Sequence, residues 1–128
     1  MLGTGQPNNM IDLISTWLRA QYLPIESSEY GAASWAVNKL FDLAHDAPDE
    51  LLPIIVEILK IDSSKTVVGA IGAGVLEELL VHHGDEYIDT LIELCKSNKN
   101  LSASSRYIHL DVNDVSSAVF KRYLAFKS

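Results

Sequence analysis

Apolar residues recur at the three- and four-residue spacing of an amphipathic helix through most of the chain. The pattern predicts helices over residues 10–22, 28–44, 49–61, 65–71, 75–83, 86–96, 102–109 and from 114 onward. Helices of this length with short connections are typical of consecutive αα-hairpins. We therefore expect an all-α fold, either a compact bundle of seven or eight short helices or a short HEAT-like stack.

Polar residues suited to helix N-termini precede most of these segments. Asn8 or Asn9 suits the start of the first helix, and Ser27 or Ser28 that of the second. Asn113 suits the start of the last helix. Short polar side chains accept hydrogen bonds from the free amides of the first turn, so these residues indicate where each helix begins.

The third segment fits two kinds of secondary structure. Residues 54–59 are apolar nearly all round and rich in β-branched residues, as in a buried strand. The length of the segment, its start signal at 46–50 and the lack of a partner strand favour a buried helix. Pro53 is tolerated only in the first turn of a helix, so we expect the helix to begin near Asp49.

The stretch 69–86 holds four of the seven glycines and is the centre of the expected fold. Gly74 is expected to cap a helix that begins at Val75. Gly84 is expected to end that helix with φ > 0, after which Asp85 begins the next helix. The small residues before Val75 would also let another backbone approach closely.

The chain of 128 residues is long enough for one domain with a single core. We expect residues 1–9 to be a flexible leader and residues 10–128 to form the domain. The leader lacks the charge and apolar pattern of a secretory signal, and no apolar run has the length of a membrane span. Cys95 is the single cysteine, so the expected compartment is the reducing cytoplasm.

The net charge of −7 makes nucleic acid a poor partner, and the charge is unevenly distributed. Residues 42–93 carry twelve acidic side chains against two basic ones, whereas residues 94–128 carry six basic against two acidic. An acidic block of this density exceeds what solubility needs. It would attract a basic protein and speed the encounter with it.

The residues that could carry chemistry are few. Glu78 and His82 are four residues apart on a helix, and His83 and Asp85 follow. Such a group could hold a metal or act in acid–base catalysis, but it lacks a second histidine at the spacing of a zinc helix. We therefore expect no metal, no cofactor and no enzymatic activity. Cys95 lies on an apolar stripe, which indicates a buried, inert thiol.

Three pieces of the chain resemble a known protein family: residues 35–43, residues 48–51 and residues 72–88. The chain is similar to a bacterial family of small, acidic, all-helical proteins that is known only as a domain of unknown function. The central motif of that family reads Ala-Gly-Pro-Leu-Glu-Asp-Leu-Leu, and residues 73–80 here read Ala-Gly-Val-Leu-Glu-Glu-Leu-Leu. The resemblance covers about residues 10–95 and implies an all-helical bacterial protein, without implying an activity.

Size, acidity and the lack of a catalytic group favour a protein that binds another protein. We expect an immunity protein or antitoxin that neutralises a basic toxin, such as a nuclease, without contacting nucleic acid or membrane itself. The expected contact residues are Asp46, Asp49, Glu50, Glu77, Glu78, Asp85, Glu86 and Asp89. Two alternatives remain: a helical scaffold with an apolar groove near Trp35, and a metal-dependent enzyme that uses Glu78, His82, His83 and Asp85.

Overall fold

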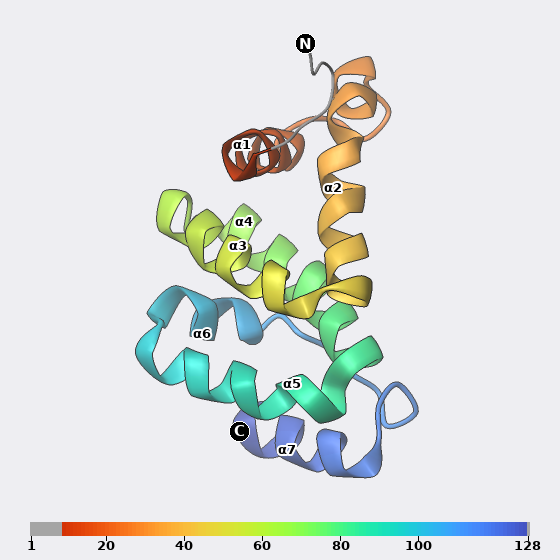
Figure 1. Ribbon diagram of the computed structural model, residues 1–128, viewed down its shortest axis with the longest axis vertical. Helices are drawn as coiled ribbons and strands as arrows, with labels where there is room; N and C mark the ends of the chain where they lie inside the picture. The colour runs from red at the N-terminus through yellow and green to blue at the C-terminus, as the bar shows by residue number, and fades with distance from the viewer. Residues whose placement is uncertain (1–8, 128) are drawn as a thin grey trace.

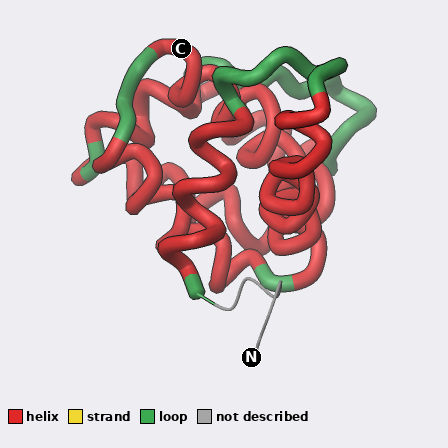
Figure 2. Tube along the Cα trace, turned by 90° about the horizontal axis from the view of Figure 1, so that it is seen from above, coloured by secondary structure: helices red, strands yellow, loops and turns green. Residues whose placement is uncertain are grey.

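The computed structural model describes residues 9–127, and these residues form helices joined by loops and turns, without a strand (Figure 2). The helices are α1 (Met10–Ala20), α2 (Ser28–Asp46), α3 (Pro48–Ile61), α4 (Lys65–Ala70), the π-helix η1 (Ile71–Leu76), α5 (Glu77–Ser97), α6 (Lys99–Ser105) and α7 (Ser117–Lys127). The predicted all-α class is therefore confirmed. The expected leader lies outside the described residues, apart from Asn9. None of the described helices combines the length and the apolar character needed to cross a membrane.

The helices are stacked along the long axis of the molecule (Figure 1). Helix α1 lies at one end, α3 and α4 follow, then α5 and α6, and α7 lies at the opposite end. Helix α2 runs along the side of the upper layers and ends near α5. Burying the apolar faces between these layers supplies the main favourable free energy of folding.

Helix α3 lies within this core. Leu51, Ile55 and Ile58 are fully buried, and Leu59 is 1% exposed. Residues 54–59 thus form a buried helix, as predicted, rather than a strand. The helix begins at Pro48, so Pro53 lies inside it and not in its first turn. Pro53 is exposed on the solvent side, where a missing amide donor and a local bend cost least.

The predicted number of helices is slightly wrong because three expected helices are joined. Helices α4, η1 and α5 form one continuous helical run over residues 65–97, so the described residues form six separate runs. Gly74 does not cap a helix, since it lies inside η1, and Val75 is not a helix start. A glycine costs a helix only about 1 kcal/mol, so packing of the buried Ile71, Val75 and Leu76 can outweigh that cost.

The predicted φ > 0 at Gly84 is also wrong. The backbone of Gly84 is outside the left-handed region, and the irregular residue is His83, with φ −137° and ψ 30°. His83 bends α5 without ending it. Asp85 does not cap a new helix, and its carboxylate instead accepts a hydrogen bond from Ser116 Oγ at 2.8 Å. Gly84 packs closely on α7, and a Cβ there would lie 3.1 Å from Val119 Cγ1.

Replacing Gly84 with alanine should therefore lower the free energy of unfolding slightly, by less than about 1 kcal/mol. The added methyl group crowds Val119, while alanine favours the helix, so the two effects nearly offset. Urea denaturation would measure the change. In a Val119→Ala background the crowding is gone, and Gly84→Ala should become stabilising. A Gly84→Ala penalty that is unchanged by Val119→Ala would contradict this packing role.

The N-terminal caps of the first two helices agree with the sequence. Asn9 Oδ1 accepts from the amide of Asp12 at 2.8 Å, and Ser27 Oγ accepts from the amide of Tyr30 at 3.0 Å. The alternative cap Asn8 lies outside the described residues. These caps are local features with side chain and amide three residues apart, which is why the sequence alone could indicate them.

The last two helices differ from the prediction. Helix α6 covers Lys99–Ser105 and is capped by Asn98, so it begins and ends earlier than the predicted 102–109. Helix α7 begins at Ser117, where Ser116 Oγ accepts from the amide of Val119 at 3.2 Å, so Asn113 is not the cap. Several Asn and Ser residues lie close together before each of these helices, and their spacing alone does not show which one is the cap.

Candidate functional site

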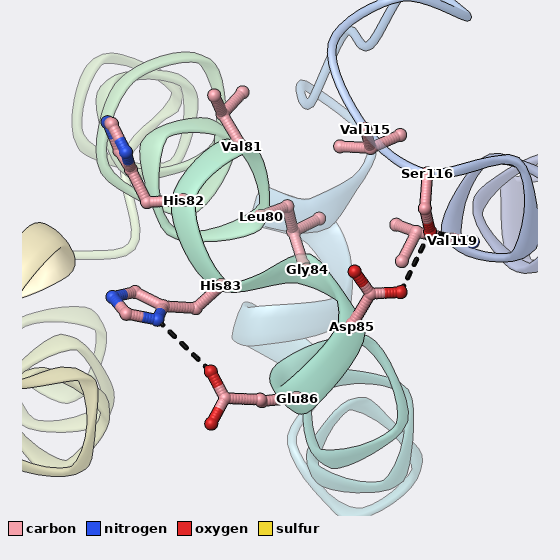
Figure 3. A pocket seen from close by; sticks show the side chains of 10 residues that line it. All are labelled: Leu80, Val81, His82, His83, Gly84, Asp85, Glu86, Val115, Ser116 and Val119. Carbon is pink, nitrogen blue, oxygen red and sulfur yellow. Dashed lines mark hydrogen bonds and ion pairs between the residues drawn. The ribbon is translucent and has the colours of Figure 1, made fainter.

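Three of the four histidines meet where the C-terminus of α2 faces the bend of α5. His45 comes from the last turn of α2, and in α5 His82 precedes the bend, which lies at His83. The rings of His45 and His82 are 4.2 Å apart between centroids, edge to face. Figure 3 shows His82 and His83 on the same side of α5, directed away from Val115, Ser116 and Val119. We call His45, His82 and His83 the histidine cluster.

His83 connects the two helices through both ring nitrogens. Nε2 lies 2.6 Å from the carbonyl oxygen of His45, and Nδ1 lies 3.3 Å from Glu86 Oε1. A carbonyl oxygen and a carboxylate only accept hydrogen bonds, so the geometry is fully satisfied when both nitrogens carry a proton. The carbonyl of His45 is in the last turn of α2, where helix carbonyls lack partners and the helix dipole is negative. Protonated His83 therefore caps the C-terminus of α2.

The electrostatics of His83 agree with this geometry. The hydrogen bond to the His45 carbonyl raises the pKa of His83 above its ordinary value of 6.5, and partial burial opposes that shift. The hydrogen bond and charge of Glu86 and the charge of Asp46 raise the pKa further. The site thus favours the imidazolium form, in which His83 holds α5 against α2.

Carboxylates surround the histidine cluster. Glu78 Oε2 lies 3.0 Å from His82 Nε2, and Asp46 Oδ1 lies 3.0 Å from His45 Nδ1. Tyr87 donates a short hydrogen bond to Asp49 at the start of α3, which raises the pKa of Tyr87 to about 12. Each carboxylate thus has an aromatic neighbour that fixes its position while its outer side faces solvent.

The predicted contact residues fall into two groups. Asp46, Asp49, Glu78 and Glu86 lie around the histidine cluster, and the exposed Glu50 follows Asp49 on α3. We call these five residues the acidic corner. The other three predicted residues, which are bound by the C-terminal part of the chain, are Glu77, Asp85 and Asp89.

The contacts of that second group are specific. Glu77 Oε1 accepts from the amide of His109 at 2.9 Å, and Asp85 accepts from Ser116. Asp89 Oδ1 accepts from Arg122 Nε at 2.6 Å and forms an ion pair with the guanidinium. Arg122 thus neutralises one carboxylate of this group, that of Asp89, whereas Glu77 and Asp85 accept from uncharged donors. The predicted contact residues thus lie in two places, at the acidic corner and beside the C-terminal part of the chain.

The four residues of the metal-enzyme alternative do not converge. Asp85 points toward Ser116, away from His83 (Figure 3). Glu78 and His82 pair with each other, and His83 pairs with Glu86. Across residues 9–127, no three His, Cys, Asp or Glu side chains are placed to hold a metal ion. The arrangement therefore offers paired hydrogen bonds rather than a coordination site.

A cavity of about 100 Å³ lies beside the bend of α5. It is bounded by residues 80–86 of α5 and by Val115, Ser116 and Val119 (Figure 3). Small-molecule sites usually have about 300 Å³ or more, so this cavity is too small to hold a typical substrate. His82 and His83 of the histidine cluster are among the residues that line it.

Sequence analysis missed His45 and Tyr87. His45 comes 38 residues before His83, and Asp49 comes 38 residues before Tyr87, so only the fold brings them together. The sequence signal for His45 was its place beside Asp46 at the end of a predicted helix, because a helix C-terminus favours a cation. Cys95 is buried, and burial raises the pKa of its thiol, in agreement with the inert role that its position predicted.

Comparison with known proteins identifies a family for the chain. No curated protein and no solved structure matches the chain. A family model described as "Family of unknown function (DUF6869)" matches residues 24–122, which include the acidic corner and most of the C-terminal part. The resemblance expected for residues 10–95 thus holds at the level of an uncharacterised domain, and the motif at residues 73–80 stays a prediction. Because the match covers well over half of the chain, the protein belongs to this family of unknown function, DUF6869.

Proposed function

We propose that this protein is a non-enzymatic inhibitor that binds a basic protein through the acidic corner. The observation that carries the proposal is the meeting of Asp46, Asp49, Glu78 and Glu86 around the histidine cluster. Their side chains are well exposed, with 73% of the surface accessible at Asp46 and Glu86 and 42% at Glu78. A bacterial immunity protein or antitoxin that acts on a toxin in the cytoplasm is the most concrete form of this function.

Two physical properties support binding to a cationic protein. The net charge of −7 gives long-range attraction to a basic surface, which speeds encounter at low ionic strength. The carboxylates are also held by ring donors, so ordering them on binding costs little side-chain entropy. The carboxylates of the acidic corner would occupy the cleft in which the basic partner otherwise binds phosphates, as expected for inhibition of a nuclease.

The scaffold alternative has less support. Trp35 is only partly buried but packs against the core, and it has a structural role there. The metal-enzyme alternative would need Glu78, His82, His83 and Asp85 in one site, and Asp85 is directed elsewhere. The binding proposal uses the observed arrangement without requiring any side chain to move.

The proposal predicts that charge controls association. A variant with Asp46→Asn, Asp49→Asn, Glu78→Gln and Glu86→Gln should bind the natural partner about tenfold more slowly at low salt. Stopped-flow mixing with a partner co-purified from the native host and identified by mass would measure the rate. The rate for the unchanged protein should fall steeply with salt, and the variant should lose most of that dependence.

A matched control removes four carboxylates elsewhere, through Asp12→Asn, Glu26→Gln, Glu29→Gln and Glu57→Gln. These residues lie on α1, on α3, at the beginning of α2 and in the connection before it, so the control has the same net charge as the first variant but an intact acidic corner. Its association rate should stay close to that of the unchanged protein. Equal slowing in both variants would show that net charge alone matters, and the acidic corner would not be the binding face.

A further inference from the structure

Two open clefts adjoin one another where α5, α6 and α7 end. The first has a volume of about 550 Å³ and the second of about 400 Å³. Ser102 and Arg106 line both clefts, so the two are neighbours, and we treat them as the two parts of one depression. Figure 1 shows that α5 leads into α6 on the side of the molecule toward which α7 ends. We call this depression the α5–α6–α7 cleft.

The charge of this cleft is opposite to that of the molecule. The whole chain has 17 acidic against 10 basic side chains. Neither part of the cleft is lined by an aspartate or a glutamate. The basic residues that line it are Lys96, Lys99, Arg106 and Lys127. A concave surface with charge of one sign raises the local concentration of ligands of the opposite sign.

Two of these cations are available to a ligand. Among the ion pairs of residues 9–127, none involves Lys99 or Arg106. Lys96 pairs with Glu93 at 3.2 Å on the exposed surface, where such pairs are weak. Lys127 is held in position by a 2.8 Å hydrogen bond from Nζ to the Ile108 carbonyl, and its ammonium keeps further donors.

The remaining lining residues add one hydroxyl donor, that of Ser102, and one apolar surface. The hydroxyls of Ser97 and Ser105 already donate to the carbonyls of Leu94 and Ser102. Ser97 and Ser102 line the first part of the cleft, and Ser102 and Ser105 line the second. Phe126 is partly buried and lines the second part. Arginine with lysine and serine hydroxyls is the donor set that binds phosphoryl oxygens, and arginine can bind two of them at once.

We propose that the α5–α6–α7 cleft binds a small phosphorylated molecule, with its phosphoryl group beside Arg106 and its organic part toward Phe126. Each part of the cleft lies within the usual volume of small-ligand sites, about 300 to 1,000 Å³. A nucleic acid strand fits less well, because its many phosphates would be repelled by the net charge of −7. This binding site is separate from the acidic corner and does not depend on the proposed inhibitor function.

Nuclear magnetic resonance titration of the full chain tests the proposal with three probes: inorganic phosphate, adenosine monophosphate and a short single-stranded RNA. Inorganic phosphate should shift the amide signals of residues 95–106 and 126–127 in a saturable way. Adenosine monophosphate should shift the same signals at lower concentration, since it also contacts Phe126. Arg106→Gln should weaken both interactions about tenfold, as expected for losing a bidentate charge-assisted contact.

Arg19→Gln is the matched control, because it removes one exposed guanidinium from α1 and leaves the cleft intact. It should bind both phosphate probes as the unchanged protein does. Shifts that do not saturate, that spread over lysines outside the cleft, or that weaken equally in both variants would overturn the proposal. RNA binding that is tighter than that of the monophosphate and is lost in Arg106→Gln would also overturn it, in favour of a nucleic acid site.

Discussion

Gly72→Ala should lower the free energy of unfolding by about 3 kcal/mol or more. This is the largest effect expected when alanine replaces any of the glycines that the structure describes. A Cβ at Gly72 would lie 1.9 Å from the carbonyl oxygen of Ser104 and 2.8 Å from Tyr107 Cβ. Real Cβ atoms do not approach so closely, so α6 would have to move away from η1. Ser104 resists that movement, because it is fully buried and its Oγ donates to the Val68 carbonyl at 2.9 Å.

Two other helical glycines are the controls for Gly72. A Cβ at Gly69 would lie 3.7 Å from the Tyr107 ring, which is ordinary contact, and one at Gly31 would meet nothing within 4 Å. Gly31→Ala and Gly69→Ala should therefore be neutral or stabilising by up to about 1 kcal/mol, through helix propensity. Urea denaturation of the three variants would measure the difference. If Gly72→Ala had the same urea midpoint as Gly69→Ala, the close approach of α6 to η1 would be contradicted.

These glycines show which part of the fold the sequence could predict. The small residues before Val75 predicted that another backbone approaches closely, and α6 does so at Gly72. The same reasoning failed for Gly74 and Gly84, which were expected to mark helix ends. A glycine in a cap and a glycine in a tight helix contact look alike in sequence, because both positions need the missing side chain. Only the packing partner distinguishes them, and that partner lies far away along the chain.

The candidate site, like the glycines, could be predicted from the sequence only in part. The sequence located the acidic block, and it placed Glu78 and His82 on one turn of helix, where the structure finds them 3.0 Å apart. The sequence could not show that Ser116 binds Asp85 or that Arg122 of α7 binds Asp89, because these partners come 31 and 33 residues later. Local periodicity gives the face of a helix, whereas contacts between distant segments depend on how the helices stack.

The bend of α5 should make stability depend on pH through His83. The folded state raises the pKa of His83 above 6.5, mainly through the His45 carbonyl. A group with a raised folded pKa contributes stability that is fully present below its unfolded pKa and is lost as pH rises through its folded pKa. The contribution of His83 should therefore be complete well below pH 6.5 and be lost as the pH rises through the raised folded-state pKa.

His83→Gln tests this dependence, because glutamine can donate to the His45 carbonyl but cannot take a positive charge. We expect the variant to be less stable than the unchanged protein by about 1 to 2 kcal/mol at about pH 5.5, as for a hydrogen bond from a charged group at a helix C-terminus. The difference should shrink at alkaline pH, above the raised folded-state pKa of His83, where the ring is neutral. Urea denaturation across this range would measure both values.

His109→Gln is the control for the general effect of replacing a histidine. The His109 side chain is 81% exposed and lies 3.6 Å from Asp111, away from the bend of α5. Replacing it should change stability little at either pH, since an exposed pair contributes little. A His83→Gln penalty that does not vary with pH would show that His83 acts only by packing, and the bend would then not depend on its charge.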